Sequence, residues 1–308
     1  MKVSIIGTGK VGTSAVIHVS YCNPEEIVVV GRNADRAKGI ALDLKHSLAA
    51  KDTDVKISSG NYSKTKNSDI IVVAVGLPRK PGMSRKDLLE GNAKIVADVV
   101  RKTYKQSKKA IYIIVTNPLD VMCYVTSKIS KFPKQRIMGM AGVLDTSRFR
   151  AFIAEKLNIS VRDVGALVLG SHGNAMVPLL SRTQIRGTNI SKFLKKNEIT
   201  SLVKRTQNAG AEIVSLEKSG SAYIAPGASI AVMVDSIINN KKRILPVSAW
   251  LNGEYGVKGM FIGVPVVLSR KGIDRIIKLN LNAEEKKLFK KSSAVIGSMI
   301  KSLNKIKY

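Results

Sequence analysis

Cysteine is scarce in this sequence, and its scarcity excludes two ways of stabilising a chain. Only two cysteines, Cys22 and Cys123, occur among 308 residues. Two thiols cannot build a disulfide framework, and by themselves they supply too few ligands for a structural zinc site. We therefore expect no bound metal. We expect instead a fold held by a hydrophobic core, which a composition of 44% hydrophobic residues can form.

Long hydrophobic runs are also missing. The longest apolar runs, such as Ile70–Val75, are far shorter than the ~20 residues that cross a bilayer. The first residues, Met1–Val3, lead directly into a strand-like pattern and not into a secretory signal. The sequence therefore predicts a soluble cytoplasmic protein with no membrane partner.

Acidic residues are few, and so are aromatic ones. Asp and Glu number 22 against 51 Lys and Arg, which gives a net charge of +29. Such a charge attracts anions of any size. Aromatic residues make up only 5%, and no stretch alternates them with basic residues, as stacking sites for single-stranded nucleic acid do. We therefore disfavour a nucleic-acid function, while a positive surface suits the steering of small anionic ligands.

The first half of the chain alternates short apolar runs with helical patterns. This alternation predicts a doubly wound parallel sheet of Rossmann type with helices on both faces. The expected strands are Lys2–Ile6, Ile27–Val30, Asp54–Ser58, Asp69–Val75 and Ala110–Val115. The expected helices are Val11–Tyr21, Asp35–Leu48, Asp87–Tyr104 and a segment that opens at Asn117-Pro118, with the proline just inside its start, and runs to about Ile129.

The second half has the pattern of an α+β domain with antiparallel strands. Asn252-Gly253, between Ser248–Leu251 and Glu254-Tyr255, predicts a hairpin with a type I′ turn. The other expected elements are strands over Val164–Leu169, Met176–Leu180 and Phe261–Leu268, and helices over Thr200–Lys218, Ala228–Ile238 and Ala283–Leu303. We place a dinucleotide-binding domain at residues 1–142 and a catalytic, substrate-binding domain at 143–308.

A glycine-rich motif directly follows the first expected strand and opens the first helix. In a G-x-G-x-x-G motif the first glycine allows a tight turn, the second lets the backbone approach a pyrophosphate, and the third lets helix and strand pack closely. The helix N-terminus favours the anion. The candidate cofactor-binding residues here are Gly7, Thr8, Gly9, Lys10, Val11 and Gly12.

The second strand lacks the acidic residue that holds the adenosine ribose hydroxyls in NAD enzymes. The sequence there is Gly31-Arg32-Asn33. An acid would repel a 2′-phosphate, whereas Arg32 could form charge-assisted hydrogen bonds with it. The site therefore predicts NADP or NAD as cofactor, with NADP(H) favoured; the alternative is that Arg32 is a solvated loop residue and NAD binds.

One of three histidines has the surroundings of a general base. His172 follows an expected strand, between Gly170 and Gly173, whereas His18 and His46 lie on expected helices. A neutral histidine at a strand end is suited to proton transfer near pH 7. Asp145 is the best candidate to fix its tautomer and stabilise its imidazolium form.

Three arginines complete a candidate substrate site. Arg79 and Arg85 lie on either side of Lys80–Ser84, a loop-like segment past a buried strand, where ligands bind in parallel α/β sheets. Arg148 follows Asp145 by three residues, so on a helix the two side chains share one face. Because arginine binds carboxylates through paired hydrogen bonds, this set beside a nicotinamide site predicts hydride transfer on a small dicarboxylate.

These motifs together resemble the lactate/malate dehydrogenase superfamily, and within it the lactate-dehydrogenase-like malate dehydrogenases of archaea and bacteria. No single motif is specific, but the set spans most of the chain in the family's order. The matching stretches are Gly7–Gly12, Gly76–Arg85, Asn92–Ile95, Thr116–Asp120, Leu144–Arg148, His172-Gly173 and Met176–Leu179.

The resemblance implies a role for each candidate residue. His172 takes the proton of the substrate hydroxyl while hydride leaves C2 for the nicotinamide, and Asp145 supports it. Arg148 binds the C1 carboxylate. Arg85, on a closing loop, polarises the C2 carbonyl during reduction, and Asn117 hydrogen-bonds near the same oxygen and the nicotinamide.

The resemblance also assigns substrate selection and further cofactor contacts. Arg79 pairs with the second carboxylate, at a position where lactate-specific relatives usually have Gln, and Ala222 leaves space for the larger substrate. The further implied cofactor-binding residues are Gly31, Arg32, Asn33, Val75, Gly76, Asn92, Val115 and Asn117.

The resemblance leaves alternatives open. The same chemistry could act on lactate/pyruvate or hydroxypyruvate, and a different class of function is a Rossmann-fold binding protein without turnover that uses its basic surface. Asn174 replaces the family's usual Asp, which removes a charge near His172. The family further implies a cytoplasmic homo-oligomer, a tetramer or a dimer, in the tricarboxylic acid cycle.

Overall fold

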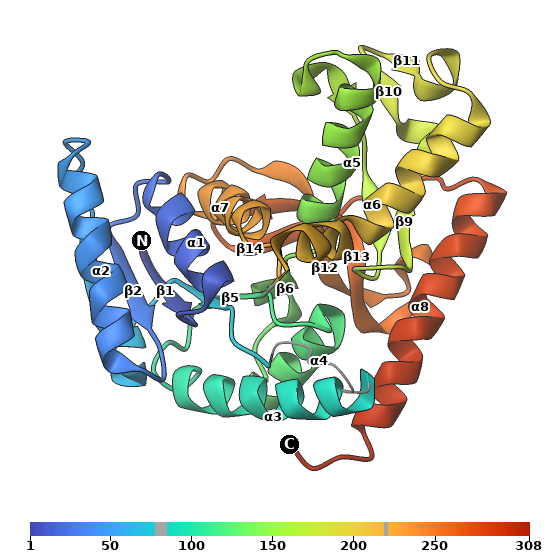
Figure 1. Cartoon of the computed structure of the whole chain (residues 1–308). Helices are drawn as coiled ribbons and strands as arrows, with labels where there is room; N and C mark the ends of the chain where they lie inside the picture. Colours follow the sequence, from blue (N-terminus) through green and yellow to red (C-terminus); the bar gives the residue numbers. More distant parts are fainter. Residues whose placement is uncertain (78–84, 219–220) are drawn as a thin grey trace.

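The computed structural model of the chain describes residues 1–77, 85–218 and 221–308. In Figure 1, α1, α2 and α3 surround the first strands at one side of the molecule, and α5 and α6 extend from the other side with β10 and β11. The helices are α1 (Lys10–Ser20), α2 (Ala34–Ala49), α3 (Arg85–Thr103), α4 (Leu119–Ser130), α5 (Gly142–Leu157), α6 (Lys196–Glu217), α7 (Ile224–Ile238) and α8 (Ala283–Leu303).

The strands form one mixed sheet and one small separate sheet. The strands are β1 (Lys2–Ile6), β2 (Glu26–Val30), β3 (Lys56–Gly60), β4 (Ile70–Val73), β5 (Ile111–Ile114), β6 (Ile137–Gly139), β7 (Val164–Gly165), β8 (Val168–Gly170), β9 (Met176–Pro178), β10 (Gln184–Ile185), β11 (Thr188–Asn189), β12 (Arg243–Asn252), β13 (Lys258–Ser269) and β14 (Gly272–Ile276). The mixed sheet has the order β3-β2-β1-β4-β5-β6-β12-β13-β8-β9, with β14 beside β13, and the small sheet has the order β11-β10-β7.

The parallel half of the mixed sheet confirms the predicted Rossmann-type fold. Strands β3 to β6 pair in parallel, with Ile5 of β1 opposite Val29 of β2 and Val72 of β4. All four residues of β4 and of β5 are buried, as expected for strands covered by helices on both faces. The strand order reverses between β1 and β4, and ligands of such sheets bind beyond the carboxyl ends at that point.

The antiparallel half continues the same sheet. β12 joins β6 through the pair Ser248–Gly139, and β13 carries the sheet on to β8 and β14. A second buried cluster, which includes Phe149 and Ile153 of α5, fills the space between α5, α6 and the small sheet. No helix within the described ranges has the length and apolar character needed to cross a membrane.

The predicted hairpin forms, but its predicted turn is wrong. Asn252 pairs with Lys258, and the chain between them is closed by a hydrogen bond from Gly253 N to Val257 O of 2.9 Å. Tyr255 does not extend a strand, because its hydroxyl donates to Ile277 O at 2.5 Å and its ring packs on Phe289. These tertiary contacts hold the tyrosine away from the ladder, so a two-residue type I′ turn cannot form.

Two other expectations need correction. The strand predicted over Val164–Leu169 is split, with β7 in the small sheet and β8 in the mixed sheet. Pro118 does not lie inside α4 but is its N-cap, in extended conformation, after a cis Asn117–Pro118 peptide bond. Both corrections leave the predicted α/β architecture unchanged.

Candidate active site

The glycine-rich loop between β1 and α1 has the shape of an anion-binding site. Gly7 has φ +124°, and a Cβ there would lie 2.3 Å from the Ala74 carbonyl oxygen. A Cβ on Gly12 would lie 1.8 Å from the carbonyl oxygen of Gly7, so helix and strand meet here at closest packing. Gly9 has open space around it and caps α1 without a side-chain hydrogen bond. The backbone N–H groups that open α1 are therefore suited to hold a pyrophosphate.

The residues after β2 form a small basic site at the outer edge of this loop. A Cβ on Gly31 would lie 2.5 Å from Thr8 Cγ2, so the Thr8 side chain fills the space that an acid would need. Asn33 caps α2 by accepting from Arg36 N at 2.9 Å, and Arg32 is exposed. Arg36 Nε donates to Thr8 O at 2.7 Å. One guanidinium group, that of Arg36, thus contacts the glycine-rich loop, and Arg32 lies nearby in sequence at the end of β2.

Sequence reasoning missed Arg36, although a signal was present. A cation in the first turn of a helix opposes the helix dipole, so Arg36 near the start of α2 is a position at which an anionic ligand would be favoured. The G-x-G-x-x-G loop fits the pyrophosphate of a dinucleotide, and Arg36 adds a positive charge beside it.

Asn92 of α3 forms hydrogen bonds with the segments that follow two central strands, β4 and β5. Its Oδ1 accepts from Leu77 N at 2.7 Å, and its Nδ2 donates to Asn117 O at 2.7 Å. A Cβ on Gly76 would lie 3.0 Å from Asn92 Oδ1. The half-buried Val75 and Val115 follow the carboxyl ends of β4 and β5, and Asn117 is exposed there. The candidate cofactor-binding residues therefore converge on one edge of the sheet.

The structure brings the predicted acid–base pair together. His172 Nδ1 lies 3.0 Å from Asp145 Oδ2, with His172 19% and Asp145 2% exposed at the side chain. His172 follows β8, and Asp145 lies in the first turn of α5. Burial acts to lower the pKa of His172, but the charge and hydrogen bond of Asp145 outweigh it, so this pKa is raised above its usual value. The arrangement favours imidazolium and leaves Nε2 for a ligand.

Arg148 lies beside this pair, and one of its donors lacks a protein partner. Its Nη1 is 3.8 Å from Asp145 Oδ1, and its buried Nε has no hydrogen-bond partner in the described structure. Burial lowers the pKa of this guanidinium, against the opposing effect of Asp145. A buried guanidinium with free donors is suited to bind a carboxylate.

Gly210 of α6 borders the same guanidinium, and sequence reasoning did not identify it. A Cβ there would lie 3.9 Å from Arg148 Nη2. Nothing in the local sequence marks this glycine, since its position depends on how α6 packs against α5. The missing side chain leaves open the approach to Arg148.

The structure describes only some of the remaining predicted residues. Arg79 and the side chain of Arg85 lie outside the described residues. Ala222 is half-buried just before α7, and its neighbour Tyr223 has Lys10 Nζ 5.1 Å from its ring centroid. The segment that carries Ala222 therefore approaches the glycine-rich loop. Asn174 is exposed.

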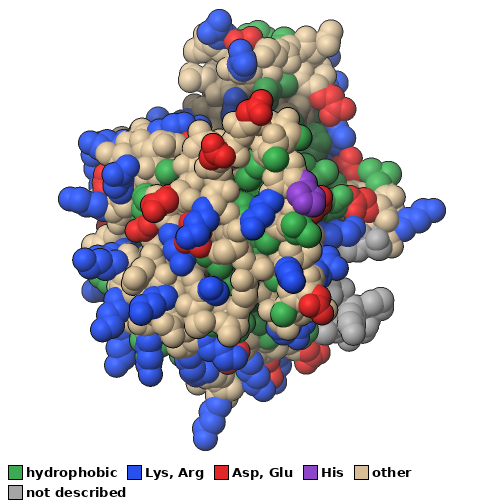
Figure 2. Space-filling model, turned by 90° about the vertical axis from the view of Figure 1, so that its left-hand side faces the viewer, with side chains coloured by type: hydrophobic (Ala, Val, Ile, Leu, Met, Phe, Trp, Pro, Cys, Tyr) green, Lys and Arg blue, Asp and Glu red, His purple; other side chains and the backbone are tan. Residues whose placement is uncertain are grey.

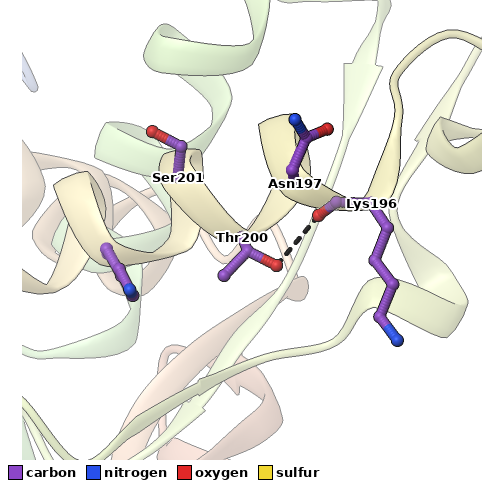
Figure 3. A pocket seen from close by; sticks show the side chains of 5 residues that line it. Lys196, Asn197, Thr200 and Ser201 are labelled. Carbon is purple, nitrogen blue, oxygen red and sulfur yellow. Dashed lines mark hydrogen bonds between the residues drawn. The ribbon is translucent and has the colours of Figure 1, made fainter.

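One surface hollow lies apart from this site. A surface hollow of about 600 Å³ follows the first two turns of α6 (Figure 3), where Thr200 Oγ1 donates to Lys196 O at 2.8 Å. Thr200 lies about 15 Å along the helix from Gly210, at 1.5 Å per residue. Across the described part of the chain, no group of three or more His, Cys, Asp or Glu side chains could hold a metal ion.

The positive charge is spread over the surface. On the face in Figure 2, Lys and Arg side chains occupy most regions, while Asp and Glu occur among them singly or in small groups. This distribution gives a diffuse positive potential, which raises the local concentration of anionic ligands.

Two family models cover nearly the whole chain. Residues 1–139 match the lactate/malate dehydrogenase NAD binding domain, and residues 142–306 match the lactate/malate dehydrogenase alpha/beta C-terminal domain. Among curated relatives, a malate dehydrogenase of Chlorobium limicola is 44% identical over 309 residues, covering 99% of both chains. One of Roseiflexus sp. is 46% identical over 303 residues, covering 98% of both.

Solved structures include enzymes named for both substrates. The malate dehydrogenase of Salinibacter ruber has a TM-score of 0.95 at 41% identity, covering 99% of this chain and 98% of its own. A minor L-lactate dehydrogenase of Enterococcus mundtii has a TM-score of 0.93 at 34% identity, covering 98% of both chains. The fold is therefore shared by relatives of either specificity.

Proposed function

The chain belongs to the lactate/malate dehydrogenase family, and from this membership we propose that it interconverts (S)-malate and oxaloacetate with a nicotinamide dinucleotide. The observation that supports the proposal most directly is the His172–Asp145 pair, with its 3.0 Å contact, beside the unpartnered Nε of Arg148. When bound, the dinucleotide exchanges hydride with C2 of the substrate. The side chains of this protein hold the substrate and move the proton.

His172 and Asp145 carry the proton step. In malate oxidation, neutral His172 accepts the proton of the C2 hydroxyl at Nε2, while its Nδ1–H donates to Asp145. In oxaloacetate reduction, imidazolium returns the proton. Because Asp145 raises the pKa of His172, reduction stays active to higher pH and declines as pH rises through that pKa. Malate oxidation increases over the same range.

Arginine side chains bind the substrate in this proposal. Arg148 holds the C1 carboxylate, since its Nε has no protein partner and Gly210 leaves the approach open. By resemblance to the family, Arg85 and Asn117 bind the C2 oxygen, Arg79 pairs with the second carboxylate, and Ala222 leaves room for it.

We expect Arg79→Gln to lower kcat/KM for oxaloacetate relative to pyruvate by at least ~100-fold, because a desolvated arginine without a carboxylate partner costs several kcal/mol. Initial rates with oxaloacetate, pyruvate and hydroxypyruvate, each with NADH and NADPH, provide the measurement. They also test the proposed reaction itself: if the wild type reduces pyruvate or hydroxypyruvate as well as oxaloacetate, the dicarboxylate specificity is wrong.

We further propose that NADP(H) is the preferred cofactor. Two arginines, Arg32 and Arg36, follow β2, Arg36 contacts the glycine-rich loop, and no acid stands at the end of β2. We expect Arg32→Asp to weaken NADPH binding roughly 10- to 100-fold more than NADH binding, since a charge-assisted hydrogen bond contributes about 1.5–3 kcal/mol. Dissociation constants from nicotinamide fluorescence check this, with the exposed Arg162→Asp, on the loop before β7, as a matched control. Equal losses of NADH and NADPH would show that Arg32 does not meet the phosphate.

The setting of the enzyme is part of the proposal. We propose a cytoplasmic homo-oligomer, a tetramer or a dimer, in the tricarboxylic acid cycle, with its dinucleotide-binding domain at 1–142 and its catalytic domain at 143–308. The exposed apolar residues Ile17 and Tyr21 near the end of α1 and Leu42 on α2 support an interface between subunits on that side.

A further inference from the structure

The first turn of α4 contains a buried carboxylate that the proposed reaction does not use. Asp120 ends the Thr116–Asp120 motif and is 2% exposed. Its Oδ1 accepts from Ser248 Oγ of β12 at 2.6 Å, and its Oδ2 accepts from Ser171 Oγ at 3.1 Å. Within the described residues, no lysine or arginine forms an ion pair with it. Its charge is therefore held by hydroxyl groups and by the start of α4.

These contacts connect Asp120 to the loop that carries the proposed acid–base residue. Ser171 directly precedes His172, and the backbone of His172 acts to lower the pKa of Asp120. Ser171 N donates to Ser292 Oγ of α8 at 2.7 Å. The loop is thus fixed by side chains from α4 and α8 at the residue next to the imidazole, and Asp120 links it to Ser248 of β12.

The charge of Asp120 also acts on the imidazole. The charged or titratable groups that act on His172 are Asp145, Arg148 and Asp120. Asp120 also acts on a second group, the buried thiol of Cys123. Asp120 and Asp145 both favour imidazolium, while Arg148 opposes it. Burial raises the pKa of Asp120 to about 6, against the opposing hydrogen bonds from Ser248 and Ser171. At neutral pH a second carboxylate therefore lies behind His172.

We infer that Asp120 is a positioning residue for His172: it fixes the His172 loop through Ser171 and supplies a second negative charge that stabilises the imidazolium form. This inference rests on the proposed function, because it assumes that His172 exchanges the proton with the substrate. A structural role alone predicts that Asp120 matters for stability. The positioning role predicts that the titration of His172 depends on the charge at residue 120.

Asp120→Asn separates these two roles. Asparagine keeps the shape and can still exchange hydrogen bonds with both serine hydroxyls, but it carries no charge. We expect the His172 titration, followed by NMR of the imidazole in the ligand-free protein, to move to lower pH than in the wild type. Only three histidines contribute signals, and His172→Asn identifies the relevant one. An unchanged titration overturns the inference.

Activity gives the second measurement. We expect Asp120→Asn to reduce kcat/KM for oxaloacetate roughly tenfold at about pH 8, because fewer molecules then carry imidazolium. We expect no loss in Tm at that pH, since the substitution removes a buried ionised group. A lower Tm with unchanged kcat/KM indicates a structural role and overturns the inference. A wild type that does not reduce oxaloacetate refutes the proposed function instead, while the NMR titration still tests Asp120.

Two further variants complete the experiment. Asp69→Asn makes the same chemical change at a carboxylate that accepts from Lys2 N at 2.8 Å, just before β4 begins and so at the other edge of the sheet. We expect it to keep the wild-type titration; an equal shift would overturn the inference. If Asp120→Asn does not fold, Ser171→Ala removes only the link to the carboxylate. We expect a lower kcat with unchanged KM for the dinucleotide, and an unchanged kcat overturns the inference.

Discussion

Replacement of His172 by Asn is expected to lower kcat for oxaloacetate reduction by roughly 10²–10⁴-fold, the usual contribution of a positioned acid or base. Asparagine can occupy the space beside Asp145, but it cannot deliver a proton at the position of Nε2. Burial of the pair keeps solvent from replacing it efficiently, since Asp145 is 2% exposed. The measurement is the loss of reduced-nicotinamide absorbance under saturating oxaloacetate.

Binding of the dinucleotide provides the internal control for this variant. His172 contacts Asp145 and not the glycine-rich loop, so we expect the dissociation constant of the reduced dinucleotide to stay within a factor of about 2. His46→Asn, at an exposed position of α2, is the matched substitution. Unchanged turnover in the His172 variant would show that this residue does not transfer the proton.

Arg148→Gln is expected to reduce kcat/KM for oxaloacetate by roughly 10³-fold. The loss of a buried partner for a carboxylate costs about 3–5 kcal/mol, and a substrate that is no longer oriented also reacts more slowly. We therefore expect KM to rise and kcat to fall together. Arg148→Lys keeps the charge but not the planar pair of donors, so we expect it to recover only part of the loss.

Arg150→Gln, two residues further along α5, is the matched control for this prediction. Arg150 Nε donates to Val164 O at 2.9 Å, and its Nη2 donates to Val161 O at 2.8 Å. We expect this variant to lower stability by about 1 kcal/mol and to leave KM unchanged. A KM for oxaloacetate that is the same in the Arg148 and Arg150 variants would contradict the carboxylate role of Arg148.

The parallel half of the fold was predictable because each segment carries its own signal. The buried strands are continuous β-branched runs, and the helices between them have apolar residues at helical spacing. The last helix was predicted with its observed bounds, Ala283–Leu303, from its amphipathic pattern and its terminal charges; in the structure Asn282 and Glu285 form a capping box at its start. Local sequence patterns therefore indicate these elements without information on long-range contacts.

The turn at 253–257 was not predictable in the same way. Asn252-Gly253 is a strong turn signal, yet Tyr255 is held by Ile277 and Phe289, which are more than 20 residues away. The short strands β10 and β11 also lack a local signal, because each has only two residues. Long-range contacts decide such segments.

The candidate site also contains some features that the sequence predicted and others that depend on long-range contacts. The chemistry of its residues suggested that His172 and Asp145 form a pair, and the structure brings them within 3.0 Å. Gly210 depends on helix packing, and the Asp120–Ser248 contact joins residues 128 positions apart. No sequence spacing encodes either contact, so only the folded chain could indicate them.

Ser248 limits which homologous chains could recombine with this one. The residue is completely buried, forms the lone backbone pairing of β12 with Gly139 of β6, and donates its hydroxyl to Asp120. A Cβ on Gly139 would lie 2.9 Å from the Ser248 Cβ, so the junction admits no bulk on either side. A chimera that joins the amino-terminal part of one homologue to the remainder of another must therefore inherit a compatible pair at these two positions. Recombination at this boundary is therefore constrained by this serine and this glycine, together with the other side-chain contacts that cross it.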